Sequence, residues 1–452
     1  MNMRIIIVGI GKVGLAITKI VCEAKHEVIV IDQNKDVIEN VSNSFDVLGI
    51  CGSACSNEVL KQAGANKCKI FIAATESDEA NMLSCLLAKN LGAKFTIARI
   101  RDFEYTKQIS ILKEILGVSL TINPEKETSN EIINMINIPE AISVESFGHE
   151  HADLLEFNVG DNSPLIGMAL KDVNSKLGVN VLVCAVSRND VVSMPNANFV
   201  FKSGDKVHFT CNNSESRLTL TKFCLVNRKI KNVLIIGGGR ISAYLAQQLV
   251  KNKYRVKLIE KNYERCKELN EILGGVDIVN ADGTDHDILM DEGLNKCDAV
   301  VCLTGNDDAN IIISMYANKN GVKKIICKVN SAPLTILLEN QKNVSIVSTK
   351  DITVNRILSF VRATNNSRGN AVQRLYKLVN GQVEAVEFQA TAKSKVLDKQ
   401  FRYLHFKNNI LIGAIIREGQ VIIPNGESDI RVGDRVIVVT SGHELNDLDD
   451  II

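Results

Sequence analysis

The strongest constraint on the fold of this chain is that its sequence contains one long unit twice. The segment 5–14, an apolar run followed by glycines, returns at 233–242 with a spacing of 228 residues. Self-similarity at a fixed period marks repeated structural units. Two copies of nearly 230 residues account for the whole length of 452 residues, so both halves should adopt the same fold. Further matches have a spacing of 229 residues: 74–81 with 303–310, Arg188 with Arg417, and Gly204-Asp205 with Gly433-Asp434.

Each copy changes in texture partway along. The first part of copy one alternates short apolar runs with helical periods, which is typical of a parallel sheet built from right-handed crossovers. From about residue 140, and again from about residue 374, the pattern becomes β-rich with Gly and Asn turns. The sequence therefore predicts an α/β fold of two tandem units, each a Rossmann-like parallel-sheet domain followed by a small β-rich α+β domain. Strands of the first sheet are expected near 4–8, 27–31, 46–50, 69–74 and 95–100.

These changes also predict the domain limits. The Rossmann-like domains should span 1–138 and 229–366, and the small β-rich domains 139–228 and 367–452. Helical stretches near 127–136 and 352–364 are expected to connect the domains. The second stretch carries an apolar stripe on one helical face, which we interpret as a packing surface in the core or between subunits. The residues of the stripe are Ile352, Val354, Ile357, Leu358 and Val361.

Charge and composition exclude several functions. The chain has 53 Lys and Arg against 52 Asp and Glu, a net charge of +1, which does not indicate a nucleic-acid-binding protein. No apolar run approaches the roughly 18 residues of a membrane span, and the first residues contain no cleavage signal. We therefore expect a soluble, intracellular chain. Its 12 cysteines are scattered among apolar neighbours without a Cys-x-x-Cys pair, so we interpret them as structural and expect no metal site.

The start of copy one predicts a nucleotide-binding loop. Gly9, Gly11 and Gly14 lie between a strand and a helix, and Asp32 ends the following strand. The first glycine allows a tight turn, the second lets backbone amides approach a pyrophosphate, and the third lets the helix pack against the strand. The helix start adds partial positive charge for phosphates. A purely structural glycine turn is the alternative. The candidate binding residues are Gly9, Ile10, Gly11, Lys12, Val13, Gly14 and Asp32.

The acid of this loop indicates the kind of ligand. At the end of the second strand, Asp32 can accept hydrogen bonds from ribose hydroxyls, which favours NAD or a plain adenosine ligand over NADP. In copy two Glu260 takes its place and can act in the same way from one methylene further out. Ser242 replaces the third glycine and is small enough for the packing. Binding is expected here too, with a ligand or affinity that can differ; the candidate residues are Gly237, Gly238, Gly239, Arg240, Ile241 and Glu260.

A second group of polar residues follows the fourth strand of each copy. The carboxyl end of that strand borders the ligand crevice of such a sheet. Helix capping is the alternative role, and both roles hold if the threonines face the crevice while the carboxylates cap the next helix. The candidates are Thr75, Glu76, Asp78 and Asn81 in copy one and Thr304 in copy two, where Asp307 and Asn310 repeat the acid and the amide.

Two arginines end the fifth strand of copy one. Arg99 and Arg101 alternate with Ile100, so Ile100 should point inward and both guanidinium groups should reach one face. Two arginines beside the crevice suit phosphates of a ligand bound by this chain or by a neighbour. A surface ion-pair role is the alternative.

The duplicated positions do not indicate catalysis. A hydride-transfer enzyme needs a general acid or base such as His or Lys beside the cofactor. None of the 7 histidines recurs at the equivalent place of the other copy, whereas glycines, acids and threonines do. This pattern favours ligand sensing, and we expect no enzyme. An NAD-dependent oxidoreductase and a stand-alone nucleotide sensor remain the alternatives.

Taken together, these residues resemble a known family, the TrkA-type regulatory subunits of bacterial Trk potassium-uptake systems. The resemblance covers essentially the whole chain and rests on the duplicated glycine loop, Asp32, the segments 52–60 and 74–81, Arg99 and Arg101, and Gly204-Asp205. It implies two tandem RCK units, each with a Rossmann-like N-lobe and a β-rich C-lobe. It further implies a cytoplasmic homo-oligomer, a ring or tetramer, docked at the inner face of the membrane under an integral potassium-transport subunit. NAD(H), ATP or ADP would bind in the N-lobes and shift the balance between conformations.

The chain also departs from the family pattern. The family often has Gly-Asp-Ala-Thr after the third strand, whereas copy one reads Gly-Ser-Ala-Cys at 52–55 and so lacks the acid. The resemblance makes Ser53 and Ala54 candidates in copy one, and Asp282 and Gly283 candidates in copy two. Arg99 and Arg101 become Lys328 and Asn330 in copy two, so phosphate binding is expected to be weaker there.

Overall fold

The computed structural model describes residues 3–148, 151–189, 191–224, 229–338, 341, 343–365, 372–379 and 381–452. They form two compact units, each assembled from segments that are distant in the sequence. Unit 1 comprises Met1–Glu127 and Thr349–Asn365. Unit 2 comprises Thr128–Ser348 and Asn366–Ile452.

Unit 1 is built on a six-stranded parallel sheet with the order β3-β2-β1-β4-β5-β6, which we call N-lobe 1 together with its helices. This is the strand order of dinucleotide-binding Rossmann folds, in which ligands lie outside the carboxyl ends of the strands where the order reverses. The aliphatic runs form central strands because both faces of a parallel sheet are buried. The strands are β1 (Arg4–Val8), β2 (Glu27–Asp32), β3 (Val47–Cys51), β4 (Ile70–Ala73), β5 (Phe95–Arg99) and β6 (Leu120–Ile122).

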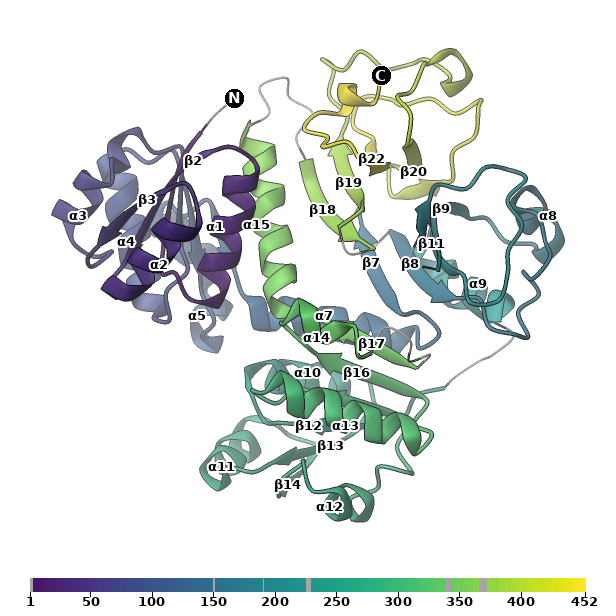
Figure 1. Ribbon diagram of the computed structural model, residues 1–452, viewed down its shortest axis with the longest axis horizontal. Coiled ribbons are helices and arrows are strands. Elements are labelled where there is room, and N and C mark those ends of the chain that lie inside the picture. The colour runs from purple at the N-terminus through teal and green to yellow at the C-terminus, as the bar shows by residue number, and fades with distance from the viewer. Residues whose placement is uncertain are drawn as a thin grey trace. The chain divides into compact units, whose positions relative to one another are not determined.

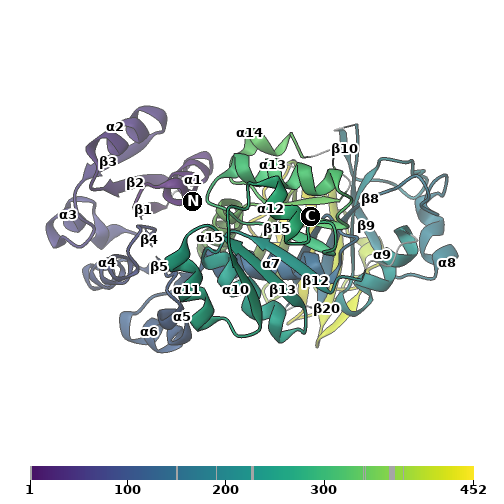
Figure 2. The ribbon, with the colours of Figure 1, turned by 90° about the horizontal axis from the view of Figure 1, so that it is seen from below.

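Helices cover both faces of this sheet. Figure 2 shows α1 and α2 on one side of the strands and α3, α4 and α6 on the other. The helices that follow in sequence are α1 (Lys12–Glu23), α2 (Lys35–Ser44), α3 (Asn57–Gln62), the 3-10 helix η1 (Ala65–Lys67), α4 (Asp78–Leu91), α5 (Phe103–Lys107) and α6 (Ile109–Leu116).

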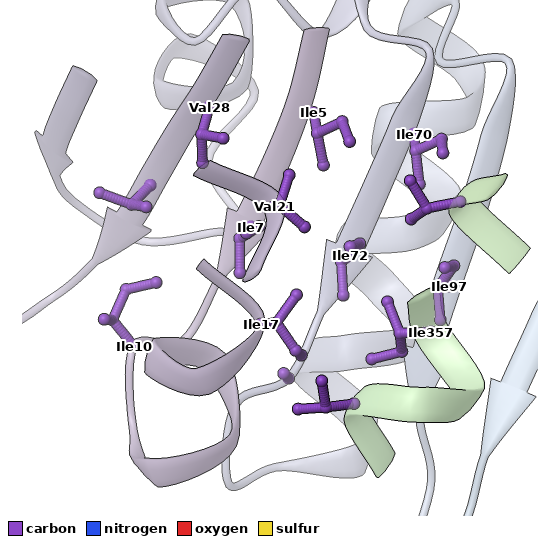
Figure 3. Close-up of a cluster of buried hydrophobic side chains, with 14 of the residues drawn as sticks. Ile5, Ile7, Ile10, Ile17, Val21, Val28, Ile70, Ile72, Ile97 and Ile357 are labelled. Atoms are coloured by element: carbon purple, nitrogen blue, oxygen red, sulfur yellow. The ribbon is translucent and has the colours of Figure 1, made fainter. Parts of the chain in front are cut away.

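One further helix of unit 1 comes from late in the sequence. Helix α15 (Thr349–Asn365) packs beside α1, as Figure 1 shows. Its Ile357 lies in the cluster that contains Ile5 and Ile7 of β1 and Ile17 of α1 (Figure 3), and Val354 and Val361 are buried in the same cluster. Each such side chain contributes about 1.5–3 kcal/mol when fully buried. The apolar stripe predicted for this helix is therefore confirmed as a core-packing surface.

Unit 2 contains the second parallel sheet, which we call N-lobe 2 together with its helices. Its order, β14-β13-β12-β15-β16-β17, repeats that of N-lobe 1. The strands are β12 (Asn232–Ile236), β13 (Arg255–Glu260), β14 (Val276–Asn280), β15 (Ala299–Cys302), β16 (Lys324–Lys328) and β17 (Val344–Val347). The helices are α10 (Arg240–Lys251), α11 (Tyr263–Ile272), α12 (His286–Asp291), α13 (Asp307–Lys319) and α14 (Ala332–Thr335).

Two five-stranded antiparallel sheets complete unit 2, and we call them C-lobe 1 and C-lobe 2. Their orders are β10-β9-β11-β8-β7 and β18-β19-β22-β20-β21. C-lobe 1 has β7 (Ser143–Phe147), β8 (Ala152–Asn158), η2 (Leu170–Asp172), α8 (Val173–Leu177), β9 (Leu182–Arg188), β10 (Val191–Ser193), β11 (Lys206–Asn212), η3 (Asn213–Glu215) and α9 (Ser216–Cys224). C-lobe 2 has β18 (Val372–Leu378), β19 (Val383–Gln389), η4 (Phe401–Tyr403), β20 (Ile410–Arg417), β21 (Gln420–Ile422), β22 (Arg435–Ser441) and η5 (Leu448–Ile451).

The two antiparallel sheets pack against each other within unit 2. A shared apolar cluster contains Phe147 and Leu154 of C-lobe 1 and Ala385 and Ile437 of C-lobe 2. The Thr210 hydroxyl also donates a 2.6 Å hydrogen bond to the carbonyl of Gly413. The fold class predicted from the repeat, two Rossmann-like sheets each followed by a β-rich sheet, is thus confirmed.

The connecting helices exchange partners between the copies. Helix α7 (Pro124–Asn137) follows the first parallel sheet, yet the Gln248 side chain of α10 donates a 3.1 Å hydrogen bond to Ser129 of α7. Tyr254, just after α10, donates a 2.8 Å hydrogen bond to Asn137. In the opposite sense, α15 follows the second parallel sheet and packs on α1 in unit 1. The predicted connector positions are therefore met by helices, and the domain limits derived from sequence stay a prediction.

Candidate functional site

The glycine loop of N-lobe 1 divides its three glycines between two roles. Gly9 has φ +81°, and a Cβ there would lie 2.7 Å from the backbone of Thr75. A Cβ on Gly14 would lie 1.9 Å from the carbonyl oxygen of Gly9, so helix and strand could not approach as they do. At Gly11, by contrast, no described atom lies within 4 Å of a Cβ. Gly9 and Gly14 are therefore required by packing, while Gly11 keeps an open surface above the loop.

The helix after this loop begins without a side-chain cap. Helices α2, α3 and α4 are capped by Asn34, Ser56 and Ser77. At the start of α1, no described side chain accepts a hydrogen bond from the first turn, no acid lies in that turn, and its first residue is the exposed Lys12. Unpaired N–H groups and the helix dipole make such an end attractive to anions. A cation at this position is disfavoured by the dipole alone, and an anionic ligand would reverse that balance.

Asp32 is tied to the glycine loop by hydrogen bonds. The backbone N–H of Ile10 donates to Asp32 Oδ2 at 2.7 Å, and that of Asn34 donates to Oδ1 at 2.9 Å. The carboxylate thus holds the loop at the end of β2, and each oxygen keeps a lone pair that can accept from a hydroxyl. The sequence predicted the position of this acid but not its bond to the loop.

N-lobe 2 reproduces this arrangement with different residues. The N–H of Gly238 donates to Glu260 Oε2 at 2.6 Å, and that of Asn262 donates to Oε1 at 2.7 Å. Gly237 has φ +98°, and at Gly239 no described atom lies within 4 Å of a Cβ. Helix α10 also begins without a described side-chain cap, at the exposed Arg240. Both N-lobes therefore present an open loop and an uncapped helix beside a loop-bound acid.

Ser242 shows how the second copy tolerates the missing third glycine. Its side chain is fully buried, and its hydroxyl donates a 2.5 Å hydrogen bond to the carbonyl of Gly237. In N-lobe 1 the equivalent carbonyl, that of Gly9, is approached directly by the backbone of Gly14. The packing role expected for serine is consistent with this bond.

The threonine and asparagine after the fourth strand form a closed polar network. The Asn81 amide accepts hydrogen bonds from the N–H and the hydroxyl of Thr75 and donates to the carbonyls of Thr75 and Arg99. Asn310 makes the same four bonds with Thr304 and Lys328. Both amides are fully buried. This network joins the ends of adjacent strands and sets Thr75 against Gly9.

The carboxylates of this group do not cap the helix that they begin, which corrects one sequence-based interpretation. Ser77 caps α4 and Asn306 caps α13. Asp78 instead accepts from the backbone N–H groups of Arg101 and Asp102, both at 2.7 Å, and Asp307 accepts from those of Asn330 and Ser331. The acid thus holds the loop after the fifth strand. The neighbouring Glu76 is exposed, and its carbonyl accepts from Arg101.

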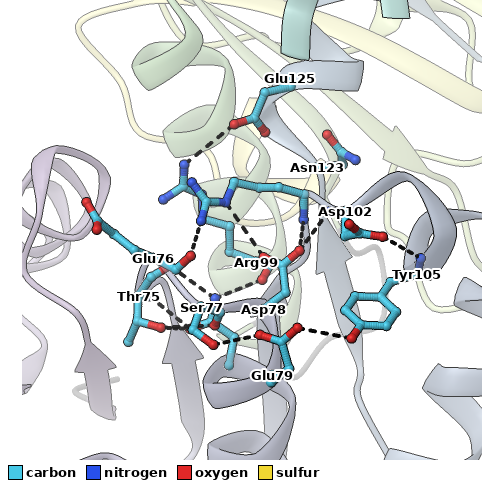
Figure 4. Close-up of polar contacts among 12 residues, drawn as sticks. Thr75, Glu76, Ser77, Asp78, Glu79, Arg99, Asp102, Tyr105, Asn123 and Glu125 are labelled. Carbon is cyan, nitrogen blue, oxygen red and sulfur yellow. Dashed lines mark hydrogen bonds and ion pairs between the residues drawn. The ribbon is translucent and has the colours of Figure 1, made fainter. Parts of the chain in front are cut away.

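Arg99 and Arg101 both lie against carboxylates, as Figure 4 shows. Nη2 of Arg99 is 3.8 Å from Oε1 of Glu125, in the first turn of α7, and Nε of Arg101 is 3.6 Å from Oδ1 of Asp78. These separations exceed hydrogen-bond length. Sequence reasoning missed Glu125, because the short strand β6 that places it beside β5 was not recognised; its signal was an acid two residues after Asn123.

The loops after the third strand of each lobe share a turn. The N–H of Cys55 donates to the Ser53 hydroxyl at 3.2 Å, and the N–H of Thr284 donates to Asp282 at 2.9 Å. Ser53 therefore makes the turn that the acid makes in copy two. The bonds from Thr284 lower the pKa of Asp282, so this exposed carboxylate adds negative charge to copy two alone. Ala54 is buried in copy one, and a Cβ on Gly283 would lie 2.5 Å from Ile236.

Two further searches concern the part of the chain that the structure describes. Among those residues no helix has the length and apolar character needed to cross a membrane. The same residues contain no group of three or more His, Cys, Asp or Glu side chains placed to hold a metal ion. All 12 cysteines are free thiols, and Cys51 is the one that is exposed.

Comparison with known proteins places this geometry in a family. Residues 5–124 and 233–349 match the TrkA-N domain, and residues 154–223 and 385–452 match the TrkA-C domain. A Trk system potassium uptake protein TrkA homolog of Archaeoglobus fulgidus is 30% identical over 449 residues, which cover 99% of this chain and 100% of that protein. The Trk system potassium uptake protein TrkA of Halomonas elongata is 29% identical over 442 residues, 96% of this chain and 95% of that protein.

Solved structures agree on the fold. The GsuK RCK domain superposes with a TM-score of 0.64 at 15% identity, covering 98% of this chain and 93% of that one. The GsuK channel bound to NAD superposes with a TM-score of 0.63 at 16% identity, covering 98% and 77%. The resemblance predicted from the duplicated motifs is thereby confirmed. With two TrkA-N and two TrkA-C domains in alternation along its full length, the chain belongs to the TrkA family of Trk potassium-uptake proteins.

Proposed function

We propose that the chain is a regulatory subunit of potassium transport whose two N-lobes bind NAD(H) or an adenine nucleotide such as ATP or ADP. The observation that carries this proposal is the repeated cradle: an open glycine, an uncapped helix start and a loop-bound acid, present in both lobes. An adenosine ligand would lay its phosphates on the helix start and its ribose against Asp32 or Glu260. Structural relatives support the ligand class, since GsuK structures include one bound to NAD and one bound to ADP.

The ligand would act as a signal and would not be consumed. The full-length relatives are named as potassium uptake proteins, which supports a regulatory role over an oxidoreductase. The binding residues inferred in copy one and copy two are backbone amides, acids and threonines, whose chemistry suits binding. A nucleotide that binds one arrangement of the lobes better than another shifts their populations by its differential affinity. Couplings of about 1–3 kcal/mol per site would add over several copies.

The regulated partner would be an integral membrane potassium-transport subunit, with this chain peripheral on the cytoplasmic face. The names of the relatives carry this inference. Assembly into a homo-oligomer, a tetramer or ring, is supported by exposed apolar side chains on equivalent helices of the two N-lobes. They are Leu83 of α4 with Ile111 and Ile115 of α6, and Ile312 and Met315 of α13 with Ile336 and Leu337 after α14. Exposed apolar residues gathered in this way mark interaction surfaces.

Calorimetric titration of the full chain with NADH, NAD, ATP and ADP tests the ligand. The loops are distinguished by Gly11→Ala and Gly239→Ala, because a methyl group at either position meets no described atom but enters the space above the loop. Gly11 has φ −73° and ψ −167°, which alanine adopts freely. We expect each single variant to lose one site and the double variant to lose both, with unchanged melting temperature. Wild-type protein that retained none of the four ligands would overturn the proposal.

Two rival functions need separate tests. Steady oxidation or reduction of the nicotinamide during incubation with metabolites, followed by NADH absorbance, would favour an oxidoreductase. A stand-alone sensor would bind nucleotide but would fail to co-purify with a potassium-transport subunit from membranes. We expect co-purification with such a subunit, in an amount that changes when the bound nucleotide changes.

A further inference from the structure

Helix α7 contains the point at which the chain leaves unit 1. Residues up to Glu127 belong to unit 1, and residues from Thr128 belong to unit 2. The helix is continuous from Pro124 to Asn137, so its first turn and its later turns are held by different units. A helix is stiff over such a length, so a change in how its first turn is held is transmitted along its axis. The contacts of this first turn therefore bear on unit 2.

The first turn of α7 is held to N-lobe 1 by two side-chain contacts. Asn123 caps it through a 2.9 Å hydrogen bond from the N–H of Lys126, and its amide donates to the Thr106 hydroxyl at 3.0 Å. The second contact is the ion pair between Glu125 and Arg99, whose side chains are only 13% and 17% exposed. A carboxylate in the first turn is favoured by the helix dipole.

The Glu125–Arg99 pair is loosely made for a pair so well buried. Its N–O distance is 3.8 Å, and Oε2 of Glu125 is buried without a hydrogen-bond partner among the described residues. The chain elsewhere builds such pairs tightly, since Arg188 grips Asp205 with bonds of 2.6 and 2.7 Å. A buried carboxylate that lacks its hydrogen bonds is costly and gains little from its cation. Arg99 can therefore be drawn away from Glu125 at small cost.

Arg99 lies at the same sheet edge as the nucleotide cradle. Asn81 bonds both to the Arg99 carbonyl and to Thr75, and Thr75 abuts Gly9. Strands β1, β4 and β5 are neighbours, so the ends of β1 and β5 are separated by about 10 Å. A chain of two or three phosphates that starts at the α1 helix spans much of this distance, and the arginine side chain spans the remainder.

We propose that Glu125 is a built-in competitor for Arg99. In the empty N-lobe its carboxylate occupies the guanidinium; a nucleoside di- or triphosphate, or a dinucleotide, draws Arg99 toward its phosphates and frees the first turn of α7. Occupancy of N-lobe 1 is thereby coupled to the helix that enters unit 2. The inference rests on the proposed function, because it needs a nucleotide in the cradle.

N-lobe 2 does not repeat this arrangement. Lys328 stands in the place of Arg99, and α15, the helix after its sixth strand, has Lys350 as its second residue where α7 has Glu125. The competition is therefore specific to N-lobe 1. This asymmetry supplies an internal control, because binding in N-lobe 2 should not respond to residue 125.

The test is ATP titration of the full chain carrying Gly239→Ala, so that N-lobe 1 is the binding site. Adding Glu125→Gln should tighten ATP binding on the order of fivefold, since the competitor is removed. The gain should vanish when Arg99→Gln is also present. Glu39→Gln is the matched control, because Glu39 forms an exposed ion pair with Lys35 in the same lobe, and it should leave ATP affinity unchanged. In the Gly11→Ala chain, Glu125→Gln should have no effect.

Hydrogen exchange of the unmutated protein gives an independent measurement. Adding ATP should speed amide exchange at 125–128 in the first turn of α7, although ligands usually slow exchange. Equal or weaker ATP affinity of Glu125→Gln, or slower exchange of α7 with ATP, would overturn the competition while leaving nucleotide binding intact. Failure of the unmutated chain to bind ATP, ADP, NAD or NADH would instead overturn both proposals.

Discussion

The carboxylate of Glu260 accepts a 2.6 Å hydrogen bond from the backbone N–H of Gly238, and this bond is the counterpart of the 2.7 Å bond from Ile10 to Asp32. The longer acid fits because position 238 has no side chain. A Cβ on Gly238 would lie 3.0 Å from Cβ and Cγ of Glu260 and 2.7 Å from Cδ1 of Leu269. The two lobes therefore pair a short acid with a bulky loop residue and a long acid with glycine.

Replacing Gly238 with alanine should destabilise N-lobe 2 by about 1–3 kcal/mol through overpacking. Glu260→Asp should recover part of this loss in the double variant, because the shorter side chain withdraws from the new methyl group. Urea unfolding followed by circular dichroism measures both effects. Equal stability of Gly238→Ala and the double variant would show that Leu269 alone, and not Glu260, restricts this position.

Gly14→Ser should be poorly tolerated even though serine occupies the same place in copy two. Its Cβ would lie 1.9 Å from the Gly9 carbonyl, so the strand and helix must separate, at a cost of about 3 kcal/mol. The reverse change, Ser242→Gly, removes one 2.5 Å hydrogen bond and should cost only about 1 kcal/mol. Thermal unfolding of the two variants beside the wild type compares them. A mild effect of Gly14→Ser would mean that α1 can shift as α10 has done.

Asn81→Ala should destabilise N-lobe 1 by about 2–3 kcal/mol, since it leaves the backbone groups of Thr75 and the Arg99 carbonyl without their partner. Asn310→Ala should have an effect of similar size in N-lobe 2. Chemical denaturation measures both, and Asn40→Ala on the exposed face of α2 serves as the control. If Asn81→Ala left stability unchanged but abolished nucleotide binding, the amide would be a ligand contact and the network would be secondary.

Stability of unit 2 should fall as pH rises above the usual carboxyl range. Burial raises the pKa of Glu145 on β7, Arg374 opposes that rise, and Glu156 adds to it. The folded state therefore binds this proton more tightly than the unfolded state, so the free energy of unfolding decreases from about pH 4.5 upward until the folded pKa is passed. Glu145→Gln should flatten this decrease between pH 5 and pH 8 in urea midpoints, whereas Glu215→Gln, at an exposed position, should not. An unchanged slope in Glu145→Gln would contradict the prediction.

The sequence predicted the parts of the fold that follow from local pattern. The repeat and the alternation of apolar runs led to both parallel sheets and to the order of their domains. The sixth strand of each sheet was missed, because β6 has three residues and its apolar pattern is too short to stand out. Those strands are fixed by pairing with β5 and β16, which no local pattern reports.

The candidate site was predictable in its residues more than in its contacts. The glycines and the acids Asp32 and Glu260 were placed correctly at the sheet edge by their spacing. The work of Asp78 was not foreseen, since its partners at 101 and 102 lie across the sheet edge and its type suits a helix cap equally well. Whether any of these residues touches a ligand stays a prediction.

The exchange of α7 and α15 has a consequence for dissecting this protein. A cut between residues 228 and 229 separates the two repeats in the gene, but it would strip N-lobe 1 of Val354, Ile357 and Val361 and leave its α1 flank bare. A minimal version of N-lobe 1 would instead join 1–127 to 349–365 through a new linker. The ancestral duplication has become interlocked, so neither half-gene now encodes a self-sufficient product.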